Sequence, residues 1–543
     1  MTDVIGIKGR KINAGIIFSV ILVLQIVAFT YLCIQKKDYH IDEIYSYILS
    51  NSYDTNSISN SADVNGQWIS GDSFLEFVTV QNGERFAYQK TYFNNTTDAH
   101  PPLFYFVLHT ICSLFPDSFS KWFGFAENIM CFIAAQIFLY LLSGRLLGSR
   151  LWGVLPPALY GALAVCADTV LFFRMYMMLT MFSIILLWLH WLMLNDNIRH
   201  IYVYLYIITF LGTFTHYYFA VFAFFTAACY CVYLIRIKQV KRFFAYSAAM
   251  TSAIATVFAV YPAAFTQITG SETNNIGNEV STHILDFSGL AHSVSVIIKS
   301  FCYSVLTTLH DRKTLIVLAA IFVLTIGSSI VKREKTKTSG TSYSGRYMII
   351  LLIIMLLTIT AVSHFSGKYA TLRYIYHVIP VGVLAAVCFL KLVSDQLSLN
   401  SAVMCMGTIV FSLAGTFSVS VNQQCSYLFP EDADIHKEVI DTCKNTPVIV
   451  LGNGKTYFAT ANYMVFSKLD RLYISDNDNI DIDELLKSVD ISNGVTFIIL
   501  TDQVWSEGYD GDETMKKVLS RSNALSEYTE VGISNYSTVY FAD

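Results

Sequence analysis

Residues 12–47 decide the fold, and they read INAGIIFSVILVLQIVAFTYLCIQKKDYHIDEIYSY. The first part, Ile12–Ile34, is an apolar run long enough to cross a bilayer, for which about 20 residues are needed. The following part is polar and contains two adjacent carboxylates, Asp42 and Glu43. Ionisable groups beside hydrocarbon are costly and often functional, although an acidic pair that simply ends a helix explains the pattern as well.

The composition of the whole chain supports a membrane protein. Of its 543 residues 54% are hydrophobic and only 14% are charged, whereas soluble domains carry about 25% charged residues. A net charge of −4, with no basic stripe, excludes a typical nucleic-acid-binding protein. Most of the 11 cysteines fall inside apolar runs, where they are expected to be small buried side chains rather than disulfide or zinc ligands.

The distribution of basic residues orients the predicted spans. Lys8, Arg10 and Lys11 precede the first run, which places the N-terminus in the cytoplasm and the loop 35–121 outside. The run His100–Phe115 has only about 16 residues, so we interpret it as a helix on the outer membrane surface. The eleven predicted spans are Ile12–Ile34, Trp122–Leu147, Leu151–Cys166, Met175–Leu194, Ile201–Thr215, Phe219–Ile235, Phe243–Tyr261, Thr314–Val331, Met348–Val362, Ile375–Leu390 and Ala402–Val421. This assignment leaves nearly all basic clusters in the cytoplasm.

The character of the chain changes after residue 422. Short apolar stretches at 447–451, 495–500 and 538–541 predict strands, and 455–468, 481–489 and 512–522 predict helices between them. We therefore predict a membrane domain at 1–422 and a small extracytoplasmic α/β domain at 423–543. The acidic run 476–483 lacks the central glycine of a calcium loop, and we interpret it as the cap of a helix.

Four short stretches occur in a fixed order: HIDEIYSY at 40–47, HPPLFYFVLH at 100–109, FFRMYMM at 172–178 with THYYF at 215–219, and LRYIYHVIP at 372–380. The ordered set resembles the membrane glycosyltransferases of the GT-C class, in particular glycosyltransferase family 39. That family contains the protein O-mannosyltransferases, and the bacterial aminoarabinose transferases are similar to it. The resemblance covers roughly residues 10–420 and implies a GT-C fold for the membrane domain.

The resemblance also implies a reaction. Members of the family transfer a sugar from a polyprenyl-phosphate carrier to an acceptor on the outer face of the membrane, and here we expect inversion at the sugar. An acceptor hydroxyl needs a base within hydrogen-bond reach, and the first acidic position of the family corresponds to Asp42. Because neighbours on a helix point about 100° apart, we expect Glu43 to orient Asp42. Arg373, with Lys368 second, is the candidate for the phosphate of the donor.

The other candidate substrate-binding residues lie at the predicted outer ends of the spans. They are His100, Asp168, Arg174, Tyr176, His216, Tyr217 and Tyr374. From their placement we expect Asp42 and Arg373 to face one cavity near the outer membrane boundary. The expected partners are the sugar-loaded carrier, membrane lipids, and a lipid, wall polymer or protein acceptor.

One position departs from the family pattern. Relatives commonly carry a carboxylate two residues before the arginine of the RMY motif, where this chain has Phe172. Either Asp168, about one helical turn earlier, replaces it, or this chain uses one carboxylate. With fewer converging oxygens we expect no metal cofactor, while leaving a divalent cation open.

Two other functions fit a multi-span chain. A transporter or lipid flippase would place ionisable groups at the bilayer midplane and break spans with Gly and Pro, whereas this chain has only nine prolines and its charges at the boundary. A receptor that binds a ligand with its external domain leaves the acidic first loop and the cations at 368 and 373 unexplained. A sugar transferase is therefore the preferred interpretation.

Overall fold

The computed structural model describes residues 4–543 apart from 8–9, 53–65, 197, 270–287, 309–311, 332–342, 368–369, 445, 453–461, 477–479, 492, 501–510, 523–526 and 535–536. The chain divides into two compact units. Unit 1 comprises Met1–Gln35, Asp98–Phe104 and Gly124–Ser426, and unit 2 comprises Lys36–Thr97, Tyr105–Phe123 and Tyr427–Asp543.

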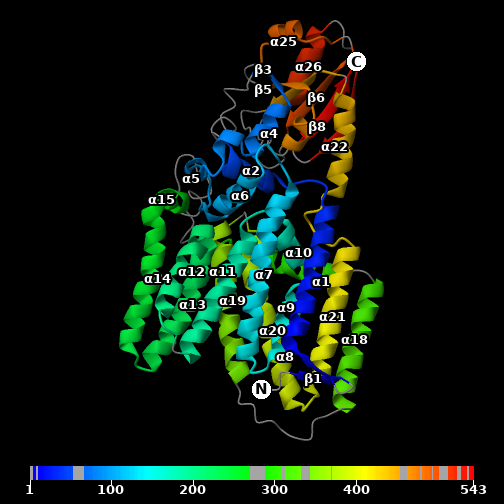
Figure 1. The fold of residues 1–543 in the computed structure, drawn as a ribbon. Helices are drawn as coiled ribbons and strands as arrows, with labels where there is room; N and C mark the ends of the chain where they lie inside the picture. The colour runs from blue at the N-terminus through cyan, green and yellow to red at the C-terminus, as the bar shows by residue number, and fades with distance from the viewer. Residues whose placement is uncertain are drawn as a thin grey trace. The chain divides into compact units, whose positions relative to one another are not determined.

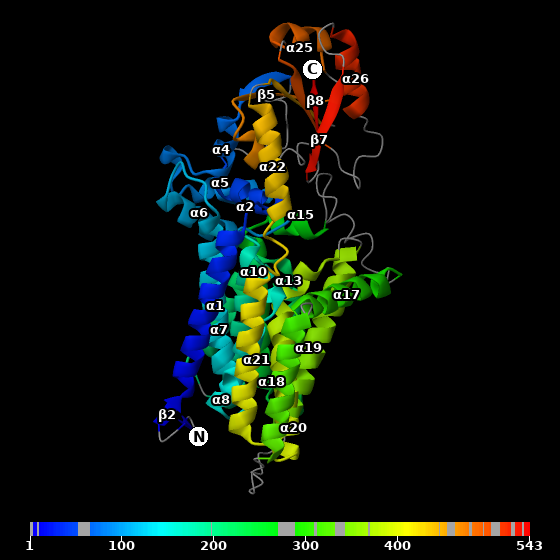
Figure 2. The same cartoon turned by 90° about the vertical axis from the view of Figure 1, so that its right-hand side faces the viewer.

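Unit 1 is helical apart from an antiparallel hairpin of β1 (Val4–Ile7) and β2 (Arg10–Asn13). Its helices are α1 (Ala14–Gln35), α7 (Lys121–Leu146, from Gly124 on), α8 (Arg150–Gly153), α9 (Leu155–Tyr160), α10 (Ala164–Leu171), α11 (Tyr176–Asn195), α12 (Ile201–Thr215), α13 (Tyr217–Arg236), α14 (Val240–Val260), α15 (Ala263–Thr269), α17 (Leu290–Thr308), α18 (Arg312–Val331), α19 (Tyr343–Ser366), the 3₁₀ helix η4 (Leu372–Val378), α20 (Ile379–Gln396) and α21 (Ser401–Val421). Long helices lie side by side: α21 is flanked by α1 and α18, and α19 packs on α20 (Figures 1 and 2).

The lengths of these helices confirm a multi-pass membrane protein. Among the described residues eight helices are long and apolar enough to cross a bilayer, and a bent pair makes up to nine. Ten of the eleven predicted spans coincide with helical segments, whereas Leu151–Cys166 falls on the bent pair, across α8, α9 and the start of α10. The difference in number arises because this pair is bent, α12 has only 15 residues, and the apolar helix found within α18 covers only Ala319–Ser328. Apolar side chains on α1, such as Val23 and Val27, are more than half exposed, as expected for a surface that faces lipid.

The bent pair is formed by Arg150–Tyr160 and Ala164–Leu171, which meet at an angle of 69°. Pro156 and Pro157 at the start of α9 and the break after Tyr160 interrupt the helical hydrogen bonds. Side chains from neighbouring helices bond to this backbone: the Ser143 hydroxyl donates to the Gly153 carbonyl at 2.7 Å, and the Nε2 atoms of Gln25 and Gln136 donate to the Pro157 carbonyl at 3.1 and 3.0 Å. The Ser143 hydroxyl replaces the N–H that Pro157 lacks, and the two amides fix the bent segment to α1 and α7.

Unit 2 combines helices of the first long loop with the C-terminal segment. The loop contributes α2 (Ile41–Asn51), β3 (Gln67–Ser70), α4 (Asp72–Val78), the 3₁₀ helix η2 (Asn82–Glu84), α5 (Tyr88–Thr96) and most of α6 (Leu103–Leu114). The C-terminal segment contributes α22 (Pro430–Cys443), β4 (Val448–Gly452), α24 (Tyr463–Phe466), β5 (Arg471–Asp476), α25 (Ile482–Ser488), β6 (Val495–Leu500), α26 (Gly511–Arg521), β7 (Tyr528–Ser534) and β8 (Ser537–Ala542). The helix predicted over His100–Phe115 is present as α6.

The strands of unit 2 form one six-stranded sheet in the order β3-β5-β4-β6-β8-β7. The three central strands β5, β4 and β6 are parallel, and the outer strands pair antiparallel. The sheet packs on α25 and α26 around a core that includes Ile449, Phe497 and Met515. The sequence correctly predicts β4, β6 and β8, and Asp481 caps α25 by accepting the N–H of Glu484 at 3.0 Å.

An edge strand from the first loop completes this sheet. Trp68 of β3 pairs with Tyr473 of β5 and donates its indole N–H to the Ser488 hydroxyl at 2.9 Å. Gly71 follows β3 where α4 approaches the chain before β5. A side chain does not fit there, because a Cβ atom added to Gly71 would lie 2.0 Å from the Leu469 carbonyl oxygen. The first loop is thus part of the fold of the C-terminal α/β segment, which the sequence did not predict.

Candidate functional site

Helix α2 begins directly after His40. The His40 Nδ1 accepts the Asp42 N–H at 3.1 Å, and the Glu43 Oε2 accepts the His40 N–H at 2.7 Å. The two side chains form a reciprocal capping box that fixes the first turn of the helix. The two carboxylates of the IDE sequence therefore occupy the second and third positions of α2, where the partial positive charge of the helix end favours acidic side chains.

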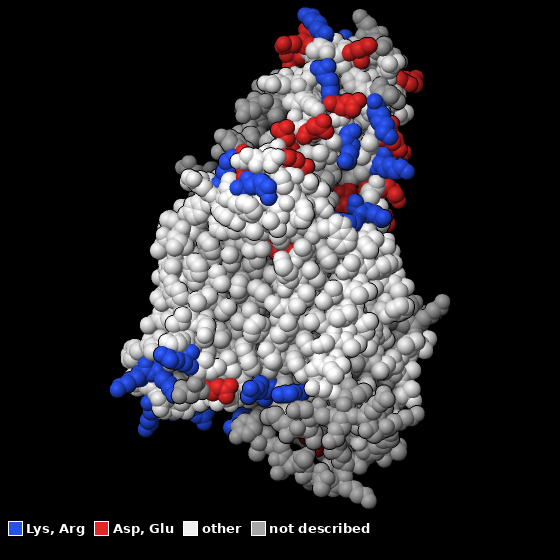
Figure 3. Space-filling view, in the orientation of Figure 1, with Lys and Arg blue, Asp and Glu red and all other residues white. Residues whose placement is uncertain are grey.

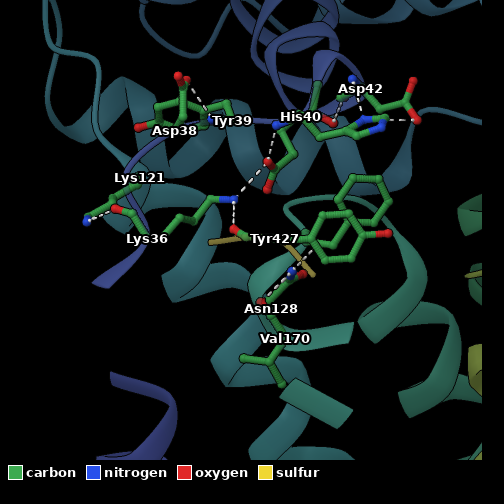
Figure 4. Close-up of polar contacts among 12 residues, drawn as sticks. Lys36, Asp38, Tyr39, His40, Asp42, Lys121, Asn128, Val170 and Tyr427 are labelled. Atoms are coloured by element: carbon green, nitrogen blue, oxygen red, sulfur yellow. Dashed lines mark hydrogen bonds and ion pairs between the residues drawn. The ribbon is translucent and has the colours of Figure 1, made fainter. Parts of the chain in front are cut away.

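Glu43 is half of a buried ion pair. Its Oε2 lies 2.9 Å from the Lys36 Nζ, and the two side chains are 0% and 1% exposed. The Lys36 Nζ also donates to the Tyr427 carbonyl at 2.7 Å and lies 5.0 Å from the centre of the Phe429 ring (Figure 4). Because removing one charge of a buried pair leaves the other without solvation, Glu43 serves to hold α2 in place.

Asp42 lies in a different environment. Its side chain is 18% exposed, and its Oδ2 is 3.6 Å from the His40 Nδ1 (Figure 4). That ring nitrogen accepts the Asp42 N–H, so the proton of the neutral imidazole is on Nε2. Of the two carboxylates, Asp42 is thus the one that solvent or a substrate reaches.

The segment before Asp42 is fixed to the chain that follows α21. The Lys37 N–H donates to the Leu428 carbonyl at 2.7 Å, and Asp38 contacts the imidazole of His436. The Lys121 Nζ donates to the Lys36 carbonyl at 2.6 Å. These bonds hold the start of α2 from both sides within unit 2.

Unit 1 contains a second group of polar residues, which we call the polar cluster: Asp98, His100, Arg174, His216 and Arg373. Arg174 lies between α10 and α11, just after a stretch held by Asn128. The Asn128 Nδ2 donates to the carbonyls of Val170 and Phe172 at 3.0 and 2.7 Å (Figure 4). The Phe173 ring packs directly on Gly124, and a Cβ atom added to that glycine would lie only 2.6 Å from the ring. Arg174 is consequently buried at a fixed position.

Asp98 was not predicted from the sequence and is central to the polar cluster. Its Oδ2 lies 2.9 Å from the His100 Nδ1. Burial raises the pKa of Asp98, but the nearby His100 and Arg174 outweigh burial and lower it below its usual value. Its carbonyl accepts the Nε2 of Gln267, whose Oε1 in turn accepts the Tyr217 hydroxyl at 2.5 Å. The only signal in the sequence is the two-residue spacing from His100.

His216 is a neutral hydrogen-bond donor in this cluster. It caps α13 by accepting the Tyr218 N–H at its Nδ1, which leaves the proton on Nε2. Burial lowers its pKa well below the usual value, and His100, His377 and Arg174 lower it further. The His216 Nε2 is buried and has no hydrogen-bond partner among the described residues.

Arg373 lies on η4 between two aromatic rings. Its guanidinium carbon is 5.6 Å from the centre of the Phe172 ring and 5.7 Å from that of Tyr374. Tyr176 stacks on Phe172 with an interplanar angle of 11°. The Phe172 ring thus contacts the arginine through a cation–π interaction.

Asp168, Lys368 and the expected Asp42–Arg373 cavity remain from the residues predicted for the site. Asp168 on α10 accepts the N–H and the hydroxyl of Ser426 at 2.7 and 3.1 Å, and so it holds the chain after α21. Lys368 lies outside the described residues. Asp42 belongs to unit 2 and Arg373 to unit 1, and the expectation that they face one cavity stays a prediction.

No protein-family model matches this chain, and no curated protein matches it. Among solved structures, it is similar to ArnT from Cupriavidus metallidurans. The ArnT structure bound to undecaprenyl phosphate has 12% sequence identity, covers 97% of both chains and gives a TM-score of 0.47. The apo ArnT structure has 10% identity, covers 92% of this chain and 96% of that chain, and gives a TM-score of 0.36.

The chemistry of the two groups differs. The polar cluster places two guanidinium groups, a neutral imidazole donor and the carboxylate of Asp98 in unit 1, so positive charge exceeds negative charge there, an arrangement suited to a ligand with anionic oxygens. The start of α2 offers one accessible carboxylate in unit 2, an arrangement suited to accepting a proton. Among the described residues no three His, Cys, Asp or Glu side chains are placed to hold a metal ion.

Proposed function

We propose that this protein is a GT-C glycosyltransferase that moves a monosaccharide from a polyprenyl-phosphate carrier to an acceptor hydroxyl. The ordered set of motifs from HIDEIYSY to LRYIYHVIP supports the class. The observation that carries the proposal is the different environment of the two carboxylates in the IDE sequence. Glu43 is neutralised by Lys36 in a buried pair, whereas Asp42 beside it is partly exposed.

In the proposed reaction Asp42 is the general base. It accepts the proton of the acceptor hydroxyl while that oxygen forms a bond to the anomeric carbon of the sugar. The bond between the anomeric carbon and the phosphate oxygen breaks with its electron pair, and polyprenyl phosphate leaves. A single displacement of this kind inverts the configuration of the sugar. Glu43 and the His40 cap keep the first turn of α2, and with it Asp42, in position.

The polar cluster binds the phosphate of the donor in this proposal. Negative charge grows on the phosphate oxygens as the bond to the sugar breaks, and fixed donors stabilise that charge. Arg373 supplies a forked guanidinium that two rings hold in place, and Arg174 supplies a second. The His216 Nε2–H is a neutral donor that adds a hydrogen bond without adding charge.

Phe172 favours the version of the mechanism that uses one carboxylate. A carboxylate at that position would pair with Arg373 and compete with phosphate, whereas the phenyl ring adds no negative charge beside the guanidinium. Asp168 already accepts two hydrogen bonds from Ser426 and is occupied in holding the chain after α21. We therefore assign Asp168 a positioning role.

The proposed orientation follows from the basic residues. With the N-terminus in the cytoplasm, the basic ends of the spans face the cytoplasm and the α/β segment lies outside the cell membrane.

The donor assignment is tested with the purified full-length chain and a polyprenyl phosphate as the probe. Arg373→Ala is expected to weaken binding of the probe at least tenfold, because a charge-assisted phosphate contact is worth about 1.5–3 kcal/mol. Arg145→Ala, at the exposed end of α7, is the matched control and is expected to bind as the wild type does. Equal affinity of the Arg373→Ala variant and the wild type removes Arg373 from the donor site.

A further inference from the structure

A polar cleft of about 430 Å³ lies at the ends of α11–α14, outside the polar cluster. Its lining includes His200, Tyr202, Tyr230, Arg242 and one carboxylate, Asp196. The volume falls in the range of small-molecule sites, roughly 300–1,000 Å³. The lining offers imidazole, hydroxyl and guanidinium donors, which together suit a phosphate group.

Cations surround this cleft. The exposed residues Arg199, Arg236, Lys238, Lys241 and Arg242 lie in the two turns that connect α11 with α12 and α13 with α14, or in the helix ends beside the second turn. None of the five forms an ion pair with a residue that the structure describes. Figure 3 shows basic side chains gathered at this end of the helices, below a broad face with almost no charged groups. Five cations against Asp196 leave the cleft with an excess of positive charge.

An apolar groove adjoins the cleft. It lies between α13 and α14, has a volume of about 430 Å³, and runs from Cys231 and Ser247 near the basic end to Phe224 and Phe258. The distance along α14 from Ser247 to Phe258 is about 16 Å at 1.5 Å per residue. That length is close to half of a hydrocarbon core of about 30 Å, which is the depth of one leaflet.

Two tyrosines form the wall between the cleft and the groove. Tyr230 lines the cleft and Tyr246 lines the groove, and their ring centres are 4.8 Å apart. The Tyr246 hydroxyl is fixed by the Nε2 of His190 at 2.8 Å. The two spaces are therefore direct neighbours, as the head and the tail of one lipid molecule require.

We propose that the cleft and the groove form a binding site for an anionic phospholipid, with its phosphate on Arg242 and an acyl chain between α13 and α14. Basic pockets between helices at the cytoplasmic side are the usual sites for anionic lipid headgroups. The positive-inside rule assigns the leaflet at this end to the cytoplasm. The groove matches the acyl chain of one leaflet, which favours an ordinary phospholipid over a longer isoprenoid. The lipid then braces the hairpin of α13 and α14, which begins at His216.

The test is native mass spectrometry of the full-length protein in detergent, titrated separately with phosphatidylglycerol, phosphatidylethanolamine and phosphatidylcholine. The wild type is expected to retain phosphatidylglycerol best, and less of it as salt increases. The double variant Lys241→Gln/Arg242→Gln is expected to retain phosphatidylglycerol roughly 30-fold more weakly. Both positions are exposed, so the fold is expected to be kept.

Two further variants separate a built site from general attraction between charges. Arg145→Gln removes a cation at the same end of the helices and is expected to leave retention unchanged. Ala255→Trp fills the groove from an exposed position and is expected to reduce retention of phosphatidylglycerol while glycerol phosphate binds as before. Equal retention of phosphatidylethanolamine and phosphatidylglycerol by the wild type, or an equal loss in the Arg145→Gln variant, overturns the proposal.

Discussion

Replacing Glu43 by glutamine tests whether the pair with Lys36 is structural. The glutamine still accepts the His40 N–H, because glutamine is also found at this position of capping boxes. The substitution removes the negative charge that balances the Lys36 ammonium at 2.9 Å, and neither side chain has solvent to replace it. Glu43→Gln therefore isolates the electrostatic contribution of the pair from the contribution of the helix cap.

The expected cost follows from the surroundings of Lys36. Breaking a buried pair costs about 3–5 kcal/mol. The Tyr427 carbonyl and the Phe429 ring remain beside the ammonium and partly stabilise it, so we expect about 3 kcal/mol, near the lower limit. A unit of 150–250 residues loses roughly 2–4 °C of Tm per kcal/mol, which gives a decrease of roughly 6–12 °C.

The assay is thermal unfolding in detergent, with the double variant Lys36→Met/Glu43→Gln as the matched control. Replacing both charges removes the unbalanced ammonium, so the double variant is expected to recover most of the lost Tm and to keep transfer activity. A decrease below about 1 kcal/mol for Glu43→Gln contradicts a buried pair. A folded double variant without activity, beside an active Asp42→Asn variant, makes Glu43 the base and refutes the roles assigned above.

Three other predictions concern both units. Burial holds the pKa of His216 well below its value in the unfolded chain. The contribution of His216 to the free energy of unfolding is therefore fully present above about pH 6.5 and falls by about 1.4 kcal/mol per pH unit below it. His216→Asn, which keeps the helix cap, should flatten the decrease in Tm between pH 7 and 5.5, and an unchanged slope contradicts this. Phe172→Asp should weaken binding of a polyprenyl phosphate about tenfold or more, because the new carboxylate pairs with Arg373. Phe172→Leu, the control, should weaken binding by only about 0.5–1 kcal/mol. A Phe172→Asp variant that binds as tightly as the wild type excludes the phosphate role of Arg373. Gly71→Ala should lower the free energy of unfolding by about 1–3 kcal/mol, because the added Cβ atom would overlap the backbone carbonyls of Leu469 and Phe466. Gly83→Ala, whose Cβ atom would have no neighbour within 4 Å, should leave it unchanged. Equal Tm values for the two variants contradict the packing of α4.

The membrane helices could be predicted because their signal is local. An apolar run of about 20 residues spans the bilayer whatever its neighbours are, and ten of the eleven predicted runs coincide with helical segments. The strands β4, β6 and β8 were predicted because their apolar residues are consecutive or alternate. By contrast, β3 has only four residues, Gln67–Ser70, and becomes a strand by pairing with β5, about 400 positions later. No pattern within the first loop indicates that distant partner.

The sequence proposes residues for the candidate site but could not predict their contacts. The sequence identified Asp42, Glu43 and Arg373, and it left open which carboxylate is accessible. That distinction depends on Lys36, which follows the first span and reads as an ordinary basic residue at a helix end. Asp98 was missed for a related reason, because its role arises from Arg174 and His100 folding against it.

The most direct test of the account is the activity of Asp42→Asn, measured as glycoconjugates by mass spectrometry. Cells that lack the protein are complemented with the wild type, with Asp42→Asn or with Lys36→Met/Glu43→Gln. Loss of a general base is expected to reduce transfer roughly 10²–10⁴-fold, so the Asp42→Asn cells should match cells without the protein, although the variant is folded and inserted. Glycoconjugates at wild-type levels in the Asp42→Asn cells contradict the central claim.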